Sequence, residues 1–333
     1  MRLNKPIIVY DMIKTACLLL SVLVLSACST HHVFHSQGNQ TGYPVSELKK
    51  QTPHYANVDQ GQLEYYRFGH GSPIVLITGY VSDVTSWDRD FIADLASQHE
   101  LIVFNNRLVA GSHGQSSTFL CKDLARDTHE LIQQLHLKKP TVLGISMGGM
   151  IAEQYAVLYP HSLSHLVLIN TALAGNAVRP TLETENSMKN IPSYKIGRFM
   201  VAVELFFPSN ERLPMAISLI NNRFLPESYQ EVDPKVVAAQ QMIAVQEWVR
   251  DKNTAKEIAK LKLPVLILNG EADQVIPPVN SEMIAATIKH SRLLRWKNGG
   301  HAMIYQYPHA LADAINQFVV ASNDLPRVSG TKK

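Results

Sequence analysis

A repeated alternation of short apolar runs with helical patterns is the feature that most limits how this chain can fold. The runs lie at residues 73–78, 101–104, 141–145, 166–169, 264–268 and 292–296. Most of them are continuous rather than alternating, which is typical of strands buried on both faces. Between them, apolar residues fall on one helical face in 120–137 and in 311–319. This order predicts an α/β fold with a mostly parallel central sheet and helices on both faces.

Two stretches depart from that pattern. Residues 63–68 alternate weakly before two glycines, which predicts an antiparallel strand at the edge of the sheet. Residues 171–257 contain no convincing buried strand, and prolines interrupt their helical segments. We therefore predict a helical cap inserted after a strand that ends at Asn170. The apolar residues of this cap either face the substrate or pack the cap onto the sheet; they include Met200, Phe206, Phe207, Phe224 and Trp248.

The first 27 residues have the layout of an export signal. Basic residues precede an apolar run at 18–25, which is too short for a comfortable membrane span. The run ends in Leu25-Ser26-Ala27-Cys28, which resembles the lipobox of bacterial lipoproteins. The resemblance implies that residues 1–27 are removed and that Cys28 is acylated and holds the protein on a membrane. Ser29, where an Asp would favour the inner membrane, points to the outer membrane of the cell envelope. The alternative is an uncleaved anchor helix.

The rest of the chain divides into a tether, one domain and a tail. Residues 28–53 are polar and aperiodic, which predicts a lipidated N-terminus followed by a flexible tether. The folded domain is expected at 54–322, and residues 323–333 are expected to be a disordered tail. Cys17 leaves with the signal and Cys28 carries the lipid, so Cys121 has no cysteine left to pair with. We expect Cys121 to start a helix and to pack as a small hydrophobe.

Charge gives no support for a nucleic-acid partner. The formal net charge is +3, and residues 1–27 hold three of the 31 Lys and Arg residues but one of the 28 acidic ones. The remaining chain is therefore close to neutral, with no basic stripe interleaved with aromatic residues. The sequence also contains no metal-ligand cluster and no glycine-rich dinucleotide motif, so we expect no metal and no cofactor.

The motif most directly connected with chemistry is Gly144-Ile145-Ser146-Met147-Gly148, a match to G-x-S-x-G. It lies between a predicted buried strand and a helix rich in small residues. This context predicts a nucleophile elbow, a sharp strand-to-helix turn that exposes the serine hydroxyl above the sheet. A serine hydroxyl is a weak nucleophile near neutral pH and needs an adjacent base that an acid orients. Ser146 is therefore a candidate nucleophile.

Candidate partners for Ser146 follow two later strands. Asp273 comes just after the run 264–268, and His301 comes after the run 292–296. The carboxyl ends of parallel strands are where folds of this class place their sites, and the chain order serine, acid, histidine is the one that a G-x-S-x-G elbow predicts. We therefore predict a triad of Ser146, His301 and Asp273, with Glu271 as the fallback acid.

Taken together, these segments resemble the α/β-hydrolase family, in particular its capped, single-domain esterases and lactonases. The resemblance covers residues 54–322 and is strong over 73–170 and 264–302. It implies an oxyanion hole of two backbone N–H groups, from Met147 and from Tyr80 in the loop after the run 73–78. That loop reads Thr78-Gly79-Tyr80 where the family commonly has His-Gly and an aromatic residue.

A second departure from the family lies near residues 105–116. The family usually shows Asp-x-Arg-Gly-x-Gly-x-Ser there, whereas this chain has Asn105 in place of the Asp and a longer spacing. We therefore expect an altered loop beside the site, with His113 as a weak candidate for a substrate contact.

The predicted reaction is hydrolysis of a carboxylic ester, thioester or lactone through an acyl-enzyme on Ser146. Serine at this position argues against the related dehalogenases and epoxide hydrolases, which use aspartate. The expected partners are a small-molecule ester and a membrane. Three alternatives stay open: a C–C hydrolase or perhydrolase with the same triad, a non-catalytic lipoprotein that binds a ligand or partner, and a structural envelope protein.

Overall fold

A computed structural model of the protein describes residues 42–323 except residue 116, residue 176, 191–194 and 230–234. The predictions for the signal peptide, for Cys28, for the tether up to residue 41 and for the tail from residue 324 lie outside the described residues. Within the described part, no helix is both long enough and apolar enough to cross a membrane.

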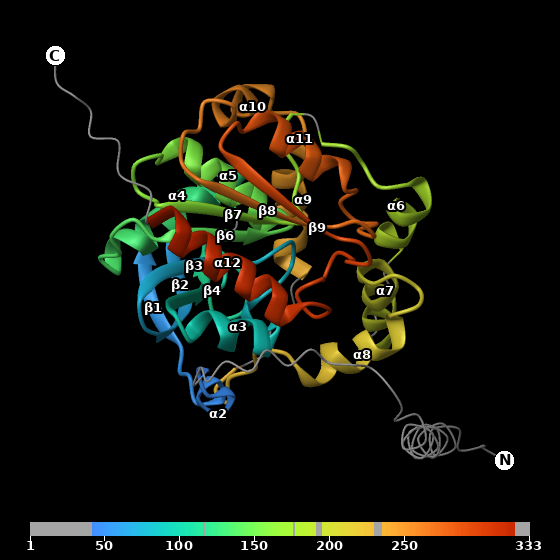
Figure 1. Ribbon diagram of the computed structural model, residues 1–333, viewed down its shortest axis with the longest axis horizontal. Coiled ribbons are helices and arrows are strands. Elements are labelled where there is room, and N and C mark those ends of the chain that lie inside the picture. The colour runs from blue at the N-terminus through green and yellow to red at the C-terminus, as the bar shows by residue number, and fades with distance from the viewer. Residues whose placement is uncertain (1–41, 116, 176, 191–194, 230–234, 324–333) are drawn as a thin grey trace. The chain divides into compact units, whose positions relative to one another are not determined.

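A single mixed sheet forms the centre of the domain (Figure 1). Its strands run in the order β1-β2-β4-β3-β6-β7-β8-β9, with the short β5 paired to β2. The neighbours from β4 to β9 are parallel, and β2 is antiparallel to both β1 and β4. The strands are β1 (His54–Val58), β2 (Gly61–Gly69), β3 (Ser72–Ile77), β4 (His99–Phe104), β5 (His113–Gly114), β6 (Thr141–Ile145), β7 (His165–Ile169), β8 (Val265–Gly270) and β9 (Ser291–Trp296).

The predicted parallel strands are confirmed, and one edge assignment is wrong. Each of the six apolar runs forms a strand of the parallel part of the sheet. The stretch 63–68 lies in β2 and is antiparallel as predicted, but β1 covers it and forms the edge instead. In β1 only Ala56 and Val58 are buried, so this strand has little apolar signal in the sequence.

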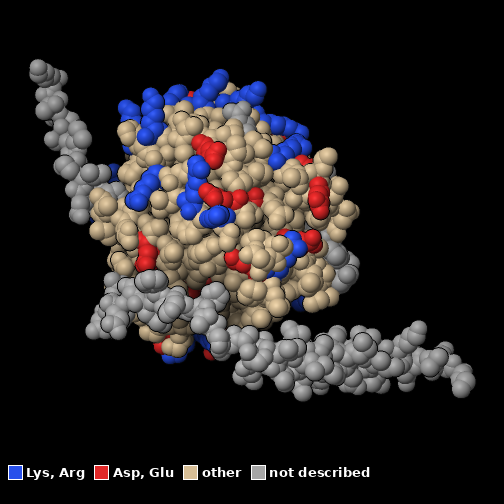
Figure 2. Space-filling view, turned by 45° about the vertical axis from the view of Figure 1, so that its right-hand side comes forward, with Lys and Arg blue, Asp and Glu red and all other residues tan. Residues whose placement is uncertain are grey.

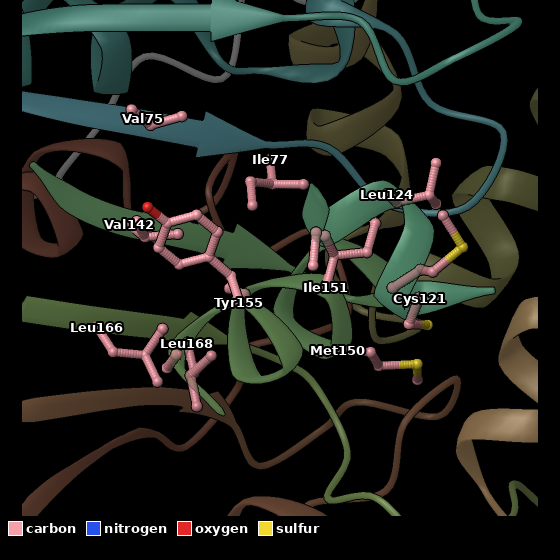
Figure 3. Packing of buried hydrophobic residues seen from close by; sticks show 14 of the residues in the cluster. Val75, Ile77, Cys121, Leu124, Val142, Met150, Ile151, Tyr155, Leu166 and Leu168 are labelled. Atoms are coloured by element: carbon pink, nitrogen blue, oxygen red, sulfur yellow. The ribbon is translucent and has the colours of Figure 1, made fainter. Parts of the chain in front are cut away.

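Alternate side chains of the parallel strands enter two separate cores. On β3, Val75 and Ile77 pack into one cluster with α4 (Cys121–Gln134) and α5 (Met147–Leu158), as Figure 3 shows. Ile74 and Leu76 point to the other face and pack with α3 (Arg89–Ala96) and α12 (Pro308–Asn323). Helix α11 (Val279–Thr287) contacts β8 and β9. The sheet is therefore covered on both faces, as the continuous apolar runs predict.

Cys121 occupies the first position of α4 and is buried, as predicted. Burial raises the pKa of its thiol to about 12, because the thiolate would lose its hydration. The side chain packs beside Leu124 and Met150 in the cluster of Figure 3. Cys121 is thus an inert apolar residue at neutral pH.

Helices fill the described part of the insertion between β7 and β8. They are α6 (Leu182–Lys189), α7 (Lys195–Phe206), α8 (Arg212–Asn221), α9 (Lys235–Trp248) and α10 (Lys252–Ile258). Helices α6, α7 and α8 form a contacting series at the right of Figure 1. Helix α10 packs against α5 and so belongs to the helical layer of the sheet rather than to the cap.

The N-terminal end of the described chain corrects the predicted tether boundary. Helix α2 (Val45–Lys49) is ordered within the predicted tether, and its Leu48 is 1% exposed in the core shared with α3 and α12. The backbone N–H of Glu227 donates to the carbonyl of Lys49 at 2.9 Å. Helix α2 contains only two apolar residues, Val45 and Leu48, so no periodicity reveals that Leu48 packs. Any tether must therefore end before α2.

Candidate active site

Ser146 lies in the sharp turn between β6 and α5. Its φ of 56° and ψ of −126° place it in a sparsely populated backbone region for an L-residue. The turn closes tightly, because a Cβ added to Gly144 would meet the backbone of Gly148, and one added to Gly148 would meet the backbone of Ile77. The hydrogen bond from the Ser146 N–H to the Ile169 carbonyl, 3.0 Å long, ties the turn to β7. These contacts explain why glycines flank the serine.

A continuous chain of hydrogen bonds joins Ser146, His301 and Asp273. His301 Nε2 lies 3.0 Å from Ser146 Oγ, and His301 Nδ1 lies 2.8 Å from Asp273 Oδ2. Because a carboxylate only accepts, this network assigns the ring hydrogen to Nδ1 and leaves Nε2 free to accept from the hydroxyl. Asp273 and His301 are 4% and 7% exposed, so water competes little for these bonds.

Asp273 is itself held in place by the loop that follows it. Its Oδ1 accepts hydrogen bonds from the N–H groups of Val275 and Ile276, both 2.8 Å long. The carboxylate therefore keeps Oδ2 for His301. Glu271, the fallback acid, is exposed, and His301 Nδ1 bonds to Asp273 instead. The structure thus brings the three predicted residues together and leaves Glu271 outside.

Asn170 is a site-supporting residue that the sequence alone did not reveal. It directly follows β7, is 0% exposed, and has a φ of 44°. Its Nδ2 donates to the carbonyls of Gly300 and His301, both at 2.9 Å. Its Oδ1 accepts from the Gly270 N–H at 2.9 Å. One carboxamide therefore joins the end of β7 to the loops that hold the acid and the histidine.

The two predicted oxyanion donors flank Ser146. Met147 is the first residue of α5, where a backbone N–H has no acceptor inside the helix. The N–H of Tyr80 donates to no described residue. Gly79 brings this loop against the serine, since an added Cβ would lie 3.2 Å from Ser146 Cβ. Both amides are therefore available to a substrate oxygen.

Helix α9 of the insertion holds the Tyr80 loop. The Val81 N–H donates to Gln241 Oε1 at 2.6 Å, and the Tyr80 hydroxyl donates to the Ala238 carbonyl at 3.1 Å. Val81 has a φ of 55°, a strained value for a β-branched residue that these bonds help to maintain. Gln241 is 0% exposed, and its Nε2 has no partner among the described residues. The cap thus takes part in shaping the site.

Helix α7 contacts the histidine loop from the other side. Its last residue, Phe206, has its ring centroid 5.5 Å from that of His301, and the Ala302 N–H donates to the Phe206 carbonyl at 3.4 Å. A Cβ on Gly300 would clash with the backbone of Phe206. Of the predicted apolar cap residues, Phe206 therefore lies at the site, whereas Phe207, Phe224 and Trp248 are buried in the cores.

Asn105, which replaces the family's Asp, is buried and has a structural role. Asn105 Oδ1 accepts from the Val84 N–H at 2.8 Å, and its Nδ2 donates to Glu64 Oε2. An aspartate could not donate to Glu64, so the amide is what this arrangement requires. His113 is exposed in β5, paired with Gln62 of β2, and contacts none of the triad residues.

The described residues contain no group of three or more His, Cys, Asp or Glu side chains placed to hold a metal ion.

Residues 72–308 match the family described as the alpha/beta hydrolase fold. The chain belongs to this family. Lipase 3 of Moraxella sp. (strain TA144) is similar to it, with 29% identity over 262 residues that cover 74% of this chain and 76% of the lipase. Lipase 1 of Psychrobacter immobilis is 25% identical over 257 residues, covering 74% and 77%.

Among solved structures, an alpha/beta hydrolase fold protein from Chitinophaga pinensis is similar with a TM-score of 0.71 and 21% identity. The likeness covers 82% of this chain and 98% of that protein. The predicted fold class and family are confirmed by these matches.

Proposed function

We propose that this α/β-hydrolase cleaves a carboxylic ester, thioester or lactone through an acyl-enzyme on Ser146. The observation that supports this most strongly is the unbroken chain of hydrogen bonds from Ser146 through His301 to Asp273, with the serine held in a strained turn. The similarity to two bacterial lipases agrees with ester chemistry. The triad residues have the contacts that nucleophilic catalysis needs.

The first half-reaction acylates the serine. His301 Nε2 takes the hydroxyl proton while Ser146 Oγ bonds to the carbonyl carbon, and the carbonyl oxygen becomes an oxyanion. The N–H groups of Tyr80 and Met147 stabilise that oxyanion, each by about 3–4 kcal/mol if they act like comparable donors. Collapse of the intermediate breaks the bond to the leaving group, which takes the proton from His301 and departs as an alcohol or thiol.

The second half-reaction restores the enzyme. A water molecule gives a proton to His301 Nε2 and attacks the acyl carbon, and Tyr80 and Met147 again stabilise the oxyanion. Breakage of the carbon–Oγ bond returns the proton to Ser146 and releases the carboxylic acid. Asp273 stabilises the positive charge on His301 in both halves.

A series of p-nitrophenyl esters with acyl chains from two to sixteen carbons tests the proposed chemistry. We expect turnover by the mature chain and none above background with Ser146→Ala. A matched control is Ser162→Ala, which removes a serine hydroxyl that bonds Tyr155 and Tyr159 away from the triad. Wild-type protein that cleaves no ester, thioester or lactone would contradict the proposal and favour a C–C hydrolase, a perhydrolase or a ligand-binding protein.

We further propose that lipid on Cys28 holds the enzyme at a membrane of the cell envelope, with the outer membrane favoured. The support is the segment Leu25-Ser26-Ala27-Cys28 after a short apolar run. A single acyl chain gives marginal binding, so stable anchoring takes two or more chains. Metabolic labelling with a palmitate analogue is expected to mark the wild type and not Cys28→Ser. Labelling of both proteins would exclude this lipid site.

A further inference from the structure

Helix α8 exposes apolar side chains on its outer face. Leu213, Ile217 and Ile220 are 62%, 45% and 65% exposed, and their i, i+4, i+7 spacing puts them on one side of the helix. The opposite side, Met215 and Leu219 among others, packs against the core. A surface helix of a soluble domain normally turns polar residues outward, so α8 is apolar where it is expected to be polar.

The neighbouring helix α7 extends this surface. Ile196 and Met200, four residues apart, are 65% and 58% exposed, and α7 is in contact with α8. We call the set the cap apolar face: Ile196, Met200, Leu213, Ile217 and Ile220. Single exposed apolar residues are ordinary, but five on two adjoining helices indicate a surface with a partner.

On α8 this face carries no charged residue, whereas Lys195 and Arg198 flank Ile196 on α7. Residues 213–222 contain no Asp, Glu, Lys or Arg. Figure 2 shows Lys and Arg gathered along the top of the view, away from the lower side of the domain, where Figure 1 places α8. A protein partner that binds through ion pairs would find few charged residues along α8. The apolar region of a lipid bilayer needs no charged residues.

The first described helix, α2, lies beside the segment that follows α8. The residues just after α8 contact the end of α2: the Glu227 N–H donates to the Lys49 carbonyl, and Ser228 Oγ donates to the Gln51 carbonyl at 3.3 Å. Figure 1 shows α2 and α8 along the same lower side of the domain. The segment that leads back to Cys28 therefore joins the domain next to the cap apolar face.

We propose that the cap apolar face rests on the lipid bilayer to which the chain is anchored. The proposal builds on the lipidation of Cys28 proposed above. Even fully extended, the residues between Cys28 and α2 span at most roughly 60 Å, so an anchored domain stays close to the bilayer. Tethering at this range gives an effective concentration on the order of millimolar, so a face with weak affinity of its own is enough.

Docking through this face also orients the site. Helix α7 contributes Ile196 and Met200 to the face and ends at Phe206, which contacts His301. The surface that meets the lipid and the loop that holds the catalytic histidine are thus parts of one continuous helix. A substrate that resides in the membrane would have a short path to Ser146.

Vesicle binding by the unlipidated mature chain, residues 29–333, tests the proposal. The probe is phosphatidylethanolamine–phosphatidylglycerol vesicles, and the readout is the fraction of protein that sediments with them. The test variant carries Leu213→Ser, Ile217→Ser and Ile220→Ser. The matched control carries Tyr55→Ser, Leu158→Ser and Val320→Ser, three apolar residues of similar exposure on β1, α5 and α12.

We expect the α8 variant to lower the partition coefficient at least about tenfold, because three apolar side chains no longer enter the interface. The control is expected to bind like the wild type. Ser146→Ala is also expected to bind like the wild type, so failure of the hydrolase proposal leaves this result unaffected. If the triple variant unfolds, Ile220→Ser and Met200→Ser, tested singly, give the same comparison.

Equal vesicle binding by the wild type and the α8 variant would overturn the proposal, as would a wild type that does not bind vesicles. Analytical ultracentrifugation covers the competing occupant, a second copy of this chain. A wild-type dimer that the α8 variant disrupts, with vesicle binding unchanged, would assign the face to self-association instead.

Discussion

At the scale of single residues, Asp273 is placed to accept three hydrogen bonds, two from backbone N–H groups and one from His301. The amides occupy one oxygen, so the other has one available donor, the histidine ring. This arrangement fixes both the tautomer and the direction of His301. Asp273 therefore acts on Ser146 only through the imidazole.

Replacing Asp273 by Asn is expected to lower kcat by about 10⁴ and to leave the fold intact. The amide oxygen would keep the bonds from Val275 and Ile276, so the NH2 group would face His301 Nδ1, favour the wrong tautomer and supply no negative charge to stabilise the imidazolium. Steady-state kinetics on a short-chain ester measure the effect. The matched control, Glu271→Gln, is expected to stay within a few-fold of wild type, since Glu271 is exposed. Loss of activity in the control, with Asn tolerated at 273, would move the acid role to Glu271.

Asn170 is expected to act as a positioning residue for His301. Asn170→Asp keeps the acceptor to Gly270 but turns a carboxylate toward the carbonyls of Gly300 and His301, where the amide donates. Displacement of the histidine loop is expected to lower kcat about ten- to a hundredfold with little change in KM. The pH dependence of kcat is expected to shift as well, which a structural defect alone would not cause.

The control for this prediction is Asn280→Asp, another fully buried carboxamide, which bonds Val178 and Pro277. It does not contact the triad. If Asn170→Asp and Asn280→Asp have equal thermal midpoints and lose activity to the same extent, Asn170 has no special role in positioning His301.

Residues of the site differ in how far the sequence reveals them. Ser146 lies in a local motif, and Asp273 and His301 follow apolar runs in a fixed chain order, so local pattern is sufficient. Asn170 and Gln241 act through partners 100 or more residues away in the chain. Their roles depend on which loops the fold brings together, and no local periodicity contains that information.

At the scale of elements, helices and strands also differ in how far the local sequence pattern reveals them. Strands buried on both faces are visible because most residues along β3, β6 and β7 are apolar, and the runs 73–78, 141–145 and 166–169 predict these strands nearly to their ends. The strand β1 and the helix α2 are half-buried, and each offers only one or two apolar residues. Their packing is set by tertiary contacts with α4, α3 and β2, which explains the misplaced sheet edge and tether boundary.

Helix α5 contains a buried carboxyl with no partner, Glu153. Both of its side-chain oxygens lack a hydrogen bond among the described residues, and burial raises its pKa well above the ordinary value. The folded protein therefore holds a proton that the unfolded chain loses above pH of about 4–5. The contribution of Glu153 to the free energy of unfolding is therefore fully present below pH of about 4–5. It is lost as the pH rises from that value toward the pKa of Glu153 in the folded protein.

Glu153→Gln removes this ionisation. We expect the thermal midpoint of the variant to exceed that of wild type at pH 8, by about 2–4 °C for each kcal/mol recovered, and the advantage to disappear near pH 5. Thermal unfolding over that pH range measures it. A difference between variant and wild type that stays constant with pH would show that Glu153 does not titrate in this way.

At the scale of the whole molecule, the α/β-hydrolase domain begins at α2 rather than at β1. Leu48 of α2 is buried in the core cluster that also contains residues of α3 and α12. Leu48→Ala is expected to lower the free energy of unfolding by about 2–4 kcal/mol, because it leaves a cavity. Urea unfolding checks this against Leu182→Ala, whose leucine is 79% exposed and whose loss is expected to change little.

A chain that starts at Gln51 lacks α2 altogether and is expected to be less stable than one that starts at Gly42, although it keeps every triad and oxyanion residue. Equal unfolding free energies for Leu48→Ala and wild type would instead mean that α2 is a detachable part of the tether.

The whole account depends on Ser146 being a nucleophile that His301 activates. The most direct test is reaction of the mature protein with a fluorophosphonate, followed by peptide mass spectrometry. The account predicts one covalent adduct, on Ser146, that is absent in Ser146→Ala and forms far more slowly in His301→Ala. Labelling that persists in Ser146→Ala, or an unlabelled wild type that still turns over esters, would contradict it.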